Sequence, residues 1–423
     1  MNVLYIWDAD YPWDVRTEKI AAAITAAGDH VHIACRNVAQ ADRLEVRPEG
    51  TVRRLPPWRV LGRRLDAWLS FPAFFNPRWI AHLWRSAREA RAEVIVVRDL
   101  PLCPTALLVG RLLSVPVVLD MAENYPAMMQ DVWNAGRQRP LDILVRNPAL
   151  VRAVERVCVH RVDHILVVVE ESAARLRSLS VSPSRLTVVS NTPPSARVSP
   201  PRAPRADADA PLELVYLGIM EIPRGVGDLV QAAALLRDRG EEIHVTLVGD
   251  GRDLDHFRDL ANELHLGPDV VTFLGRLAHA DALDVLRRAE VGVVPHHADE
   301  AWNTTIPNKL FDYMAAGLAV LSSDAEPCAR VLKETGAGLV FRSGDPAHLA
   351  ESIVRLRDAP SRVAMARAGQ AAVRDRFNWE ADAARLRQAL ERVVCAPDAR
   401  RAGRADTRSP APRDEPATRN RAP

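Results

Sequence analysis

The stretch VGVVPHHADEAWNTTIPNKLFDYMAAGLAVLS, at residues 291–322, indicates the fold class of the whole chain. It begins and ends with short apolar runs that are typical of buried strands, and a polar loop and a short helix are predicted between them. Thr304, Thr305 and Pro307 are typical of a helix start, and Gly317 is typical of a helix end. The succession of strand, helix and strand predicts an α/β fold with a parallel sheet.

The predicted helix that starts at Pro307 carries polar residues suited to a ligand. Asn308, Lys309 and Asp312 are predicted on nearly one face, because residues three and four apart are neighbours on a helix. A helix N-terminus that follows a buried strand, with a lysine in its first turn, favours a bound phosphate group. An ordinary solvated pair of Lys309 and Asp312 explains the same residues equally well when the motif is taken alone.

Length and composition describe a globular protein of two domains. The 423 residues exceed what one core usually serves, and 48% hydrophobic with 26% charged residues is an ordinary globular composition. A net charge of +2 does not favour nucleic acid as a partner. Five widely spaced cysteines without metal-ligand spacing argue for reduced thiols in the cytoplasm and against a zinc site. The N-terminus lacks a basic signal region, and no apolar run is long enough to span a bilayer.

The first half of the chain repeats the pattern of strand and helix. Six apolar runs are predicted strands, at residues 3–7, 31–35, 93–97, 115–119, 165–169 and 186–189. Ligands of parallel α/β sheets bind beyond the carboxyl ends of the strands, where residues 8–16, Asp99 and residues 120–125 fall. These segments include Asp14, Arg16, Asp120 and Glu123. For Asp14 and Arg16 the alternative is a helix N-cap followed by a surface arginine.

An insertion at residues 53–91 combines nine arginines with a large share of the aromatic residues of the chain. Basic and aromatic side chains mixed on helices are typical of a surface that contacts a membrane interface. The alternative is an amphipathic helical pair whose aromatic residues belong to the core. The two interpretations differ in where the tryptophans of the insertion point, namely Trp58, Trp68, Trp79 and Trp84.

The second half, after a linker-like segment at 195–211, contains three loops that follow predicted strand ends. Glycines in two of these loops, at 218–225 and 249–252, let backbone amides approach a ligand closely. Arg224 and Lys309 could neutralise a diphosphate. The chain has no P-loop motif, which disfavours a P-loop nucleotidase.

Four motifs in this half, LVYLGIMEIPRG, HVTLVGDGRDL, VTFLGRL and PNKLFDYMAAGLAVLSSD, resemble in this order the donor half of the family 4 glycosyltransferases with the GT-B fold. The resemblance covers nearly all of residues 1–394. It implies two facing Rossmann-like domains, with parallel sheets and helices on both faces, that bind the acceptor at 1–194 and a nucleotide-diphospho-sugar at 212–378. A helix at 379–394 would cross back to the first domain, and the tail at 395–423 is predicted to be disordered. The resemblance also implies retention of configuration and no metal or other cofactor.

Carried over motif by motif, the resemblance implies a donor site in the second domain. The implied donor-binding residues are Gly218, Arg224, Gly225, Gly249, Gly251, Gly275, Pro307, Asn308, Lys309 and Asp312. Arg224, Lys309 and the helix N-terminus at Pro307 would stabilise the charge that develops on the leaving diphosphate. On the acceptor side, where Asp14, Arg16, Asp120 and Glu123 are expected, the acceptor proton would pass to Glu123, to Asp14 or to the departing phosphate.

Several positions depart from the family pattern. Thr304 and Asp312 stand where the family commonly has two glutamates, and Ala122 stands where a histidine often precedes the residue equivalent to Glu123. Ile219 replaces an arginine that often follows the first glycine. These departures predict a subgroup with an altered site or a weakened enzyme.

The predicted function is hexosyl transfer from a nucleotide-diphospho-sugar to a glycan or a lipid-linked acceptor, in cell-envelope polysaccharide or glycoconjugate assembly. Two alternatives remain, a non-hydrolysing nucleotide-sugar 2-epimerase and a catalytically weak GT-B protein that serves as a binding or scaffold partner. The predicted localisation is the cytoplasm. If the insertion at 53–91 is interfacial, the protein would lie at the inner face of the cell membrane, with a lipid-linked acceptor.

Overall fold

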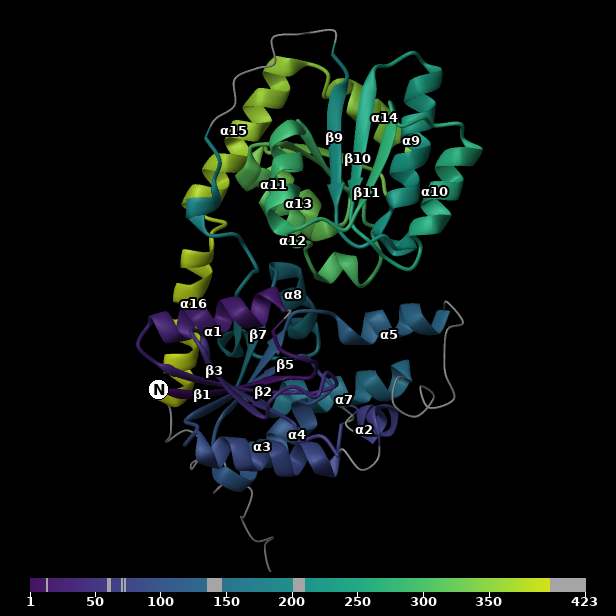
Figure 1. Cartoon of the computed structure of the whole chain (residues 1–423). Coiled ribbons are helices and arrows are strands. Elements are labelled where there is room, and N and C mark those ends of the chain that lie inside the picture. Colours follow the sequence, from purple (N-terminus) through teal and green to yellow (C-terminus); the bar gives the residue numbers. More distant parts are fainter. Residues whose placement is uncertain are drawn as a thin grey trace, which may run out of the picture.

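The computed structural model describes residues 1–12, 14–58, 62–69, 71, 74–134, 147–200 and 210–395. Two α/β domains face each other, and a helical segment runs along one side from the second domain to the first (Figure 1). The predicted tail lies outside the described residues apart from Cys395, and so does the part of the predicted linker at 201–209. Within the described ranges, no helix combines the length and the apolar character needed to cross a membrane.

The first domain is built on an eight-stranded sheet in the order β3-β4-β2-β1-β5-β6-β7-β8. Its strands are β1 (Asn2–Trp7), β2 (His30–Cys35), β3 (Leu44–Arg47), β4 (Gly50–Arg54), β5 (Val94–Arg98), β6 (Val117–Met121), β7 (His164–Val167) and β8 (Leu186–Val188). Its helices include α1 (Val15–Ala26), α2 (Arg63–Leu69), α3 (Pro77–Glu89), α4 (Cys103–Leu113), α5 (Tyr125–Asn134), α7 (Pro148–Arg161) and α8 (Glu170–Ser178), with short 3-10 helices η2 (Pro183–Arg185) and η3 (Ser195–Arg197).

One hairpin of this sheet differs from the sequence prediction. β3 and β4 pair antiparallel, whereas β4 pairs parallel with β2, so the sheet is parallel except at one edge. Arg53 and Arg54 belong to β4, and the predicted insertion therefore begins inside a strand. The hairpin escapes prediction because β3 is short and its Leu44 and Val46 side chains are exposed, which leaves no apolar run.

The second domain has a six-stranded parallel sheet in the order β11-β10-β9-β12-β13-β14. Its strands are β9 (Leu212–Leu217), β10 (Ile243–Val248), β11 (Val271–Gly275), β12 (Val291–Val294), β13 (Ala319–Ser323) and β14 (Gly338–Phe341). Its helices are η4 (Ile222–Arg224), α9 (Val226–Asp238), α10 (Leu254–Glu263), α11 (His279–Arg288), η5 (Trp302–Thr304), α12 (Asn308–Ala316), α13 (Glu326–Thr335), α14 (Pro346–Arg355) and α15 (Ala359–Asp375), and α16 (Trp379–Val394) follows them.

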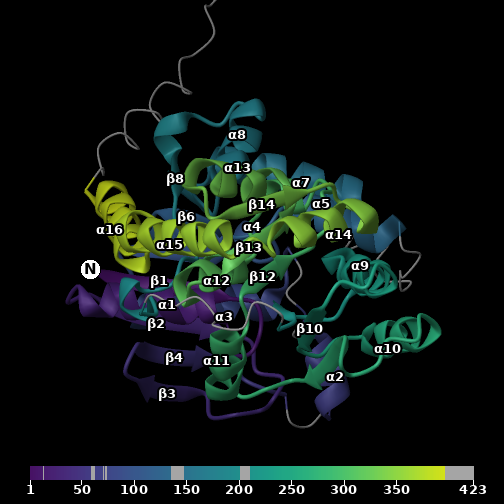
Figure 2. The same cartoon turned by 90° about the horizontal axis from the view of Figure 1, so that it is seen from above.

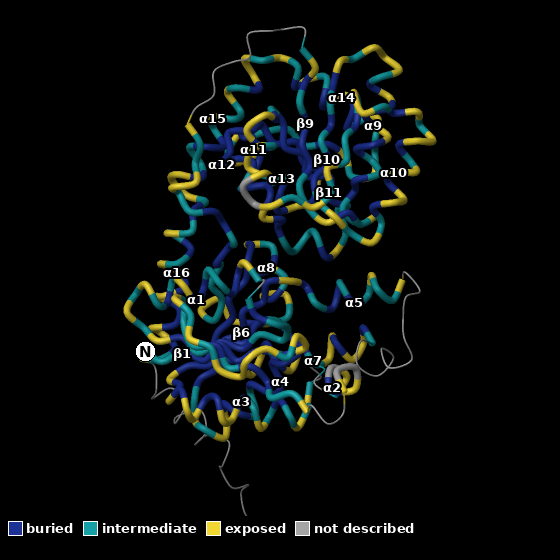
Figure 3. The backbone as a smooth tube through the Cα atoms, in the orientation of Figure 1, coloured by how far each residue is buried: buried dark blue, intermediate teal, exposed yellow. Residues whose placement is uncertain are grey.

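Both sheets are buried on two faces, which explains why their strands are almost continuously apolar. Separate clusters of buried side chains lie on the two sides of each sheet, and Figure 3 shows the buried interior under an exposed outer layer. The strand order reverses between β1 and β5 in the first sheet and between β9 and β12 in the second. In such sheets the crevice beyond the carboxyl ends at the reversal point is the usual place for a ligand.

Helix α16 leaves the second domain and packs against the first. Leu386 and Leu390 of α16 are buried in the same cluster as β1 and α1 residues such as Tyr5 and Ile20. Figure 2, seen from above, shows α16 at one side of the molecule, with α15 continuing from it in yellow-green. The Asp382 side chain is fully buried and accepts hydrogen bonds from the Ser190 backbone amide, at 3.0 Å, and from the Thr192 hydroxyl.

We expect Asp382→Ala to destabilise the first domain, because it leaves two buried donors next to β8 without their acceptor. The expected loss is about 2–4 kcal/mol, measured as a lower urea midpoint. Glu391→Ala is the matched control, since Glu391 is half exposed and pairs only with Arg387 on the surface of α16. Equal midpoints for the two variants would show that Asp382 does not hold the crossing helix in place.

Candidate functional site

The side chain of Lys309 is buried at the carboxyl end of β12. Its Nζ atom makes no hydrogen bond to any described residue and lies 3.8 Å from the centre of the Tyr216 ring. Burial, with the nearby Arg224 charge, lowers the pKa of Lys309 well below the ordinary lysine value. The solvated pair of Lys309 and Asp312 is therefore wrong as an interpretation, and the amine is placed where an anion would satisfy it.

Two glycines leave the backbone beside Lys309 without side chains. Gly218 has a φ of 155°, and a Cβ atom there would lie 2.5 Å from Lys309 Nζ. Gly249 has a φ of 140°, and its Cβ would lie 1.8 Å from the Gly218 carbonyl oxygen. The loops after β9 and β10 therefore pack on each other so closely that a side chain at either position would close the crevice.

Arg224 brings a second cation toward Lys309. Its guanidinium lies 4.6 Å from the centre of the Trp302 ring, and its Nη1 lies 3.4 Å from His296 Nε2. Burial and the charges of Lys309 and Arg224 lower the pKa of His296 well below its usual value, so the imidazole is neutral. In the described part of the chain, Arg224 makes no ion pair, which leaves its charge available.

His296 and Trp302 were not among the predicted site residues. His296 is 1% exposed, its Nδ1 atom has no hydrogen-bond partner among the described residues, and its ring meets Trp302 edge to face at 4.3 Å. Both lie between β12 and α12, within residues 291–322. An aromatic residue and a histidine directly after a buried strand were the available signal, but only the fold brings them to Arg224.

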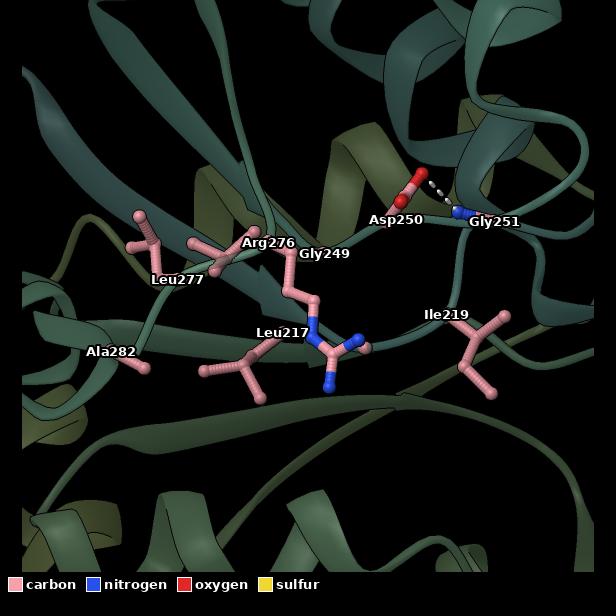
Figure 4. Close-up of a pocket in the computed structure, with 10 residues that line it drawn as sticks. Leu217, Ile219, Gly249, Asp250, Gly251, Arg276, Leu277 and Ala282 are labelled. Atoms are coloured by element: carbon pink, nitrogen blue, oxygen red, sulfur yellow. Dashed lines mark hydrogen bonds between the residues drawn. The ribbon is translucent and has the colours of Figure 1, made fainter. Parts of the chain in front are cut away.

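A cavity of about 500 Å³ continues from this crevice toward β11, a volume in the range of small-molecule sites. Figure 4 shows the Arg276 side chain extending between Leu217 and Ile219, while the Asp250 carboxylate accepts a hydrogen bond from the Gly251 amide. The cavity is lined by Leu217, Gly218, Ile219, Val248, Gly249, Asp250, Gly251, Arg276, Leu277 and Ala282. Arg276, Leu277 and Ala282 were not among the predicted site residues, which included only Gly275 in this part of the chain.

The start of α12 differs from the prediction in two details. Thr304 belongs to η5, and Pro307, not a threonine, is the N-cap residue of a helix that starts at Asn308. Asn308 is exposed, whereas Lys309 is buried, so the prediction that Asn308 shares a face with Lys309 is wrong. Successive helical residues point about 100° apart, and the inward turn of Lys309 therefore directs Asn308 outward.

The remaining donor-side predictions have clear positions. Gly225, with a φ of 68°, joins η4 to the N-terminus of α9, and a Cβ there would collide with the Pro295 carbonyl oxygen. Gly275 ends β11 at the edge of the cavity, next to Arg276. Asp312 lies one turn after Lys309 and is half-buried. Burial lowers the pKa of Lys19, in the first domain, to about 8, and the nearby Asp312 charge acts against this shift.

Arg16 and Asp120 form a buried ion pair beneath the cleft of the first domain. Arg16 Nε lies 3.0 Å and 3.1 Å from the two Asp120 carboxylate oxygens, and the residues are 3% and 0% exposed. Tyr5 donates a hydrogen bond to the same carboxylate at 2.7 Å. Burial would raise the pKa of Asp120, but the Arg16 guanidinium holds it low. The surface-arginine alternative is wrong for Arg16, and the pair supports the cleft from below.

Asp14 and Glu123 have different surroundings. Asp14 is the N-cap of α1, with Oδ1 accepting from the Thr17 amide at 2.7 Å and from Arg98 Nη1 at 3.0 Å. Glu123 makes no ion pair within the described ranges, and it precedes α5 on the face toward the second domain. Desolvation and the Asp99 carboxylate raise the pKa of Glu123, against Arg98 and Arg224.

Two further carboxylates lie in the same part of the first domain, and the sequence had placed both at strand ends without assigning them to the site. Asp8 and Asp99 follow β1 and β5 at the reversal point of the first sheet. Burial, followed by the Asp99 charge, raises the pKa of Asp8 to about 6. No group of three or more His, Cys, Asp or Glu side chains in the described part of the chain could hold a metal ion. The sequence shows both aspartates at strand ends, but not that they lie together.

Family models match both halves of the chain. A model described as "Glycosyl transferase 4-like domain" matches residues 14–192, and one described as "Glycosyl transferases group 1" matches residues 211–358. Together they cover more than half of the chain, on either side of the cleft.

Two curated relatives show the same relationship. A glycogen synthase of Mycobacterium tuberculosis is 25% identical over 295 residues, covering 69% of this chain and 67% of the relative. A phosphatidyl-myo-inositol mannosyltransferase of Mycobacterium leprae is 30% identical over 183 residues, covering 43% of this chain and 46% of the relative. The chain thus spans about half the length of the mannosyltransferases that it matches.

Solved structures share the fold at low identity. The sucrose-phosphate synthase of Thermosynechococcus elongatus has a TM-score of 0.72 at 20% identity, covering 93% of this chain and 99% of that one. HepE of Anabaena, solved in complex with UDP-glucose, has a TM-score of 0.69 at 13% identity, covering 92% and 99%. Both predictions of the sequence analysis, the GT-B fold and the family, are confirmed. The chain belongs to the family 4 glycosyltransferases with the GT-B fold, and it is a glycosyltransferase.

Proposed function

We propose that the chain transfers a sugar from a nucleotide-diphospho-sugar, with retention, to a glycan or lipid-linked acceptor in cell-envelope polysaccharide or glycoconjugate assembly. The observation that carries this proposal is the buried Lys309 Nζ atom, which has no hydrogen-bond partner among the described residues and lies beside the bare backbone of Gly218. A buried amine of this kind is costly unless an anion occupies the space next to it. The cavity of about 500 Å³ alongside has room for the nucleoside.

Charge stabilisation follows from these positions. When the bond to the sugar breaks, negative charge develops on the diphosphate, and fixed positive groups favour that state. Arg224, Lys309 and the N-terminus of α12 after Pro307 supply such groups at the crevice of the second sheet. Because Lys309 and His296 are desolvated, interactions at this point are stronger than they would be in water.

Glu123 is the side chain that we assign to the acceptor proton, with the departing phosphate as its alternative. Asp14 is already engaged by the Thr17 amide and by Arg98, so its carboxylate is less available. Glu123 has no ion pair within the described residues. Desolvation and the Asp99 charge of the first domain raise its pKa, whereas the charges of Arg98 and of Arg224 in the second domain lower it. A carboxylate with a raised pKa is a better proton acceptor near neutral pH.

We expect Lys309→Met to weaken binding of the true donor about 10- to 100-fold, because a charge-assisted hydrogen bond to a phosphate is lost. Calorimetry with a panel of UDP-, GDP- and ADP-sugars gives the dissociation constants. Lys333→Met is the control, since Lys333 is an exposed lysine on α13 of the same domain. Unchanged binding by Lys309→Met would remove the diphosphate assignment. A wild-type protein that binds none of the panel would overturn the nucleotide-sugar proposal.

We expect a bell-shaped pH profile of kcat/KM. Glu123 must be ionised to accept a proton, so activity falls as pH drops through its raised pKa. Lys309 must be charged to hold the diphosphate, so activity falls again as pH rises through its lowered pKa. Glu123→Gln should slow turnover and abolish only the acidic limb, which initial rates across pH would reveal. An intact acidic limb with undiminished turnover would take Glu123 off the list.

We also propose that residues 53–91 contact a lipid surface. Trp79 is fully buried and belongs to the core, but Trp58, Trp68 and Phe75 are 49%, 56% and 67% exposed. Nine arginines stand against two carboxylates in the segment, and the Arg78 guanidinium lies 4.3 Å from the centre of the Trp58 ring. Exposed aromatic side chains among cations suit an anionic lipid surface and favour a lipid-linked acceptor.

We expect the protein to float with phosphatidylglycerol vesicles at low salt, and the double variant Trp68→Ala/Phe75→Ala to remain mostly in the soluble fraction. The expected loss is at least tenfold in the vesicle-bound fraction, because both exposed rings lose their interfacial contact. Leu112→Ala on α4, which removes an exposed leucine outside the insertion, should bind like the wild type. A wild-type protein that does not float refutes the membrane part of the proposal alone.

A further inference from the structure

The two domains meet through side chains that flank both halves of the site. Asn124 Nδ2 donates a hydrogen bond to Thr304 Oγ1 at 3.1 Å, and Thr305 Oγ1 donates one to the Ala122 carbonyl at 3.2 Å. The Ser172 hydroxyl of α8 also donates to the Thr304 carbonyl. We name this set, Ala122, Asn124, Ser172, Thr304 and Thr305, the domain seam.

The orientation of the polar groups in the domain seam is determined on both sides. Asn124 Oδ1 accepts from the Ala127 amide at 3.3 Å at the start of α5, which leaves Nδ2 to donate across the cleft. Thr304 Oγ1 donates to the Glu300 carbonyl at 2.9 Å, so its lone pair is free to accept from Asn124. The Asn124 side chain and the Thr304 hydroxyl are thus each bonded within their own domain as well as across the cleft.

Apolar and charged contacts extend the domain seam. Ala122, Val168 and Val169 of the first domain belong to the same buried cluster as Ile306 and Phe311 of the second. Beside this cluster, Arg330 of α13 holds both carboxylate oxygens of Glu171 of α8, at 2.6 Å and 3.1 Å. A bidentate pair of this geometry fixes orientation as well as distance.

The domain seam lies immediately next to the reacting groups. Ala122 and Asn124 are the chain neighbours of Glu123, and Thr305 precedes Lys309 by four residues in the segment that starts α12. A hydrogen bond across the seam therefore sets the distance between the proton acceptor and the diphosphate site more directly than the distant α16 connection does.

We propose that Asn124 and Thr304 are positioning residues for sugar transfer, which hold Glu123 over the diphosphate site by closing the cleft. The inference rests on the proposed function. Closure of such a cleft excludes water from the reacting centre, and a displacement of about 1 Å between reacting groups costs roughly a hundredfold in rate. Thr304 and Ala122, two of the positions that depart from the family pattern, both lie in the domain seam.

Thr304→Val and Asn124→Ala test the proposal by kinetics. Each should lower kcat about tenfold, leave the dissociation constant of the donor within about twofold, and raise the share of donor that is hydrolysed by water. Thr304→Ser keeps the hydroxyl and should restore the wild-type rate. The control Thr335→Val removes a hydroxyl whose hydrogen bonds, to the Val331 carbonyl and from the Ala337 amide, both lie within the second domain. A lower kcat that Thr304→Ser does not restore would indicate a packing role and would overturn the proposal.

A charge exchange provides a second test. Glu171→Arg and Arg330→Glu should each lower kcat, and the double variant should recover most of the wild-type rate, because the pair is reversed across the cleft. Recovery is not expected if either residue serves only its own domain. Failure of the double variant to exceed both single variants contradicts a closing role for this contact.

A distance measurement separates this inference from the proposed function. Cys395 is exposed and the other four cysteines are buried, so spin labels at Cys395 and at Asp238→Cys report the separation of the two domains. Without any donor, the wild type should give a narrow distribution, and Thr304→Val and Asn124→Ala should give a longer, broader one. If variants and wild type agree, the domain seam does not close the cleft. If distances change but no donor is used, the proposed function fails and the domain seam stands.

Discussion

The relative placement of the two sheets is the constraint on which the site depends. The charged residues assigned to the donor and the acceptor lie at or beyond the carboxyl ends of strands, so they can act together only if the two sets of strand ends face each other. Helix α16 fixes this arrangement from the side, by burying Leu386 and Leu390 in the first core and by accepting two buried hydrogen bonds at Asp382. The contacts of α16 with the first domain are local, but they determine the geometry of the whole cleft.

Within that cleft the fold maintains an electrostatic imbalance. Lys309 and the neutral His296 are buried without complete hydrogen bonding within the described residues, and the Arg224 guanidinium lies beside His296 and over the Trp302 ring. Such an arrangement opposes folding, since a buried unpaired amine costs several kcal/mol or loses its proton. An arrangement that lowers stability is expected where a charged ligand restores the balance. The buried ion pair of Arg16 and Asp120 in the other domain is complete, and it has a supporting role.

Most of the architecture could be predicted from the sequence because parallel strands buried on both faces are nearly continuous apolar runs. The hairpin of β3 and β4 could not, since its exposed edge carries polar residues and lacks that signal. Lys309 and the glycines of the donor side were identified from motif spacing. His296 and Trp302 were not, because they meet Arg224, which is far away from them in the chain. Asp8 and Asp99 were placed at strand ends, but not as neighbours of each other. The helical spacing also predicted the wrong direction for the Asn308 side chain, because a shift of one residue along a helix can turn a side chain from the core to solvent.

The domain seam gives a physical explanation for the departures from the family pattern at positions 304 and 122. Considered separately, Thr304 lacks a carboxylate and Ala122 lacks an imidazole, and each would indicate a weakened site. In the structure, the hydroxyl of Thr304 bonds Asn124, and the carbonyl of Ala122 accepts from Thr305, so the two positions belong to one contact between the domains. A longer charged side chain at 304 would have to be desolvated between the loops, and an imidazole at 122 would have to fit where the domains already touch. Small residues at both positions therefore favour a closely fitted cleft, in which Glu123, Arg224 and Lys309 are the charged groups that we propose for transfer.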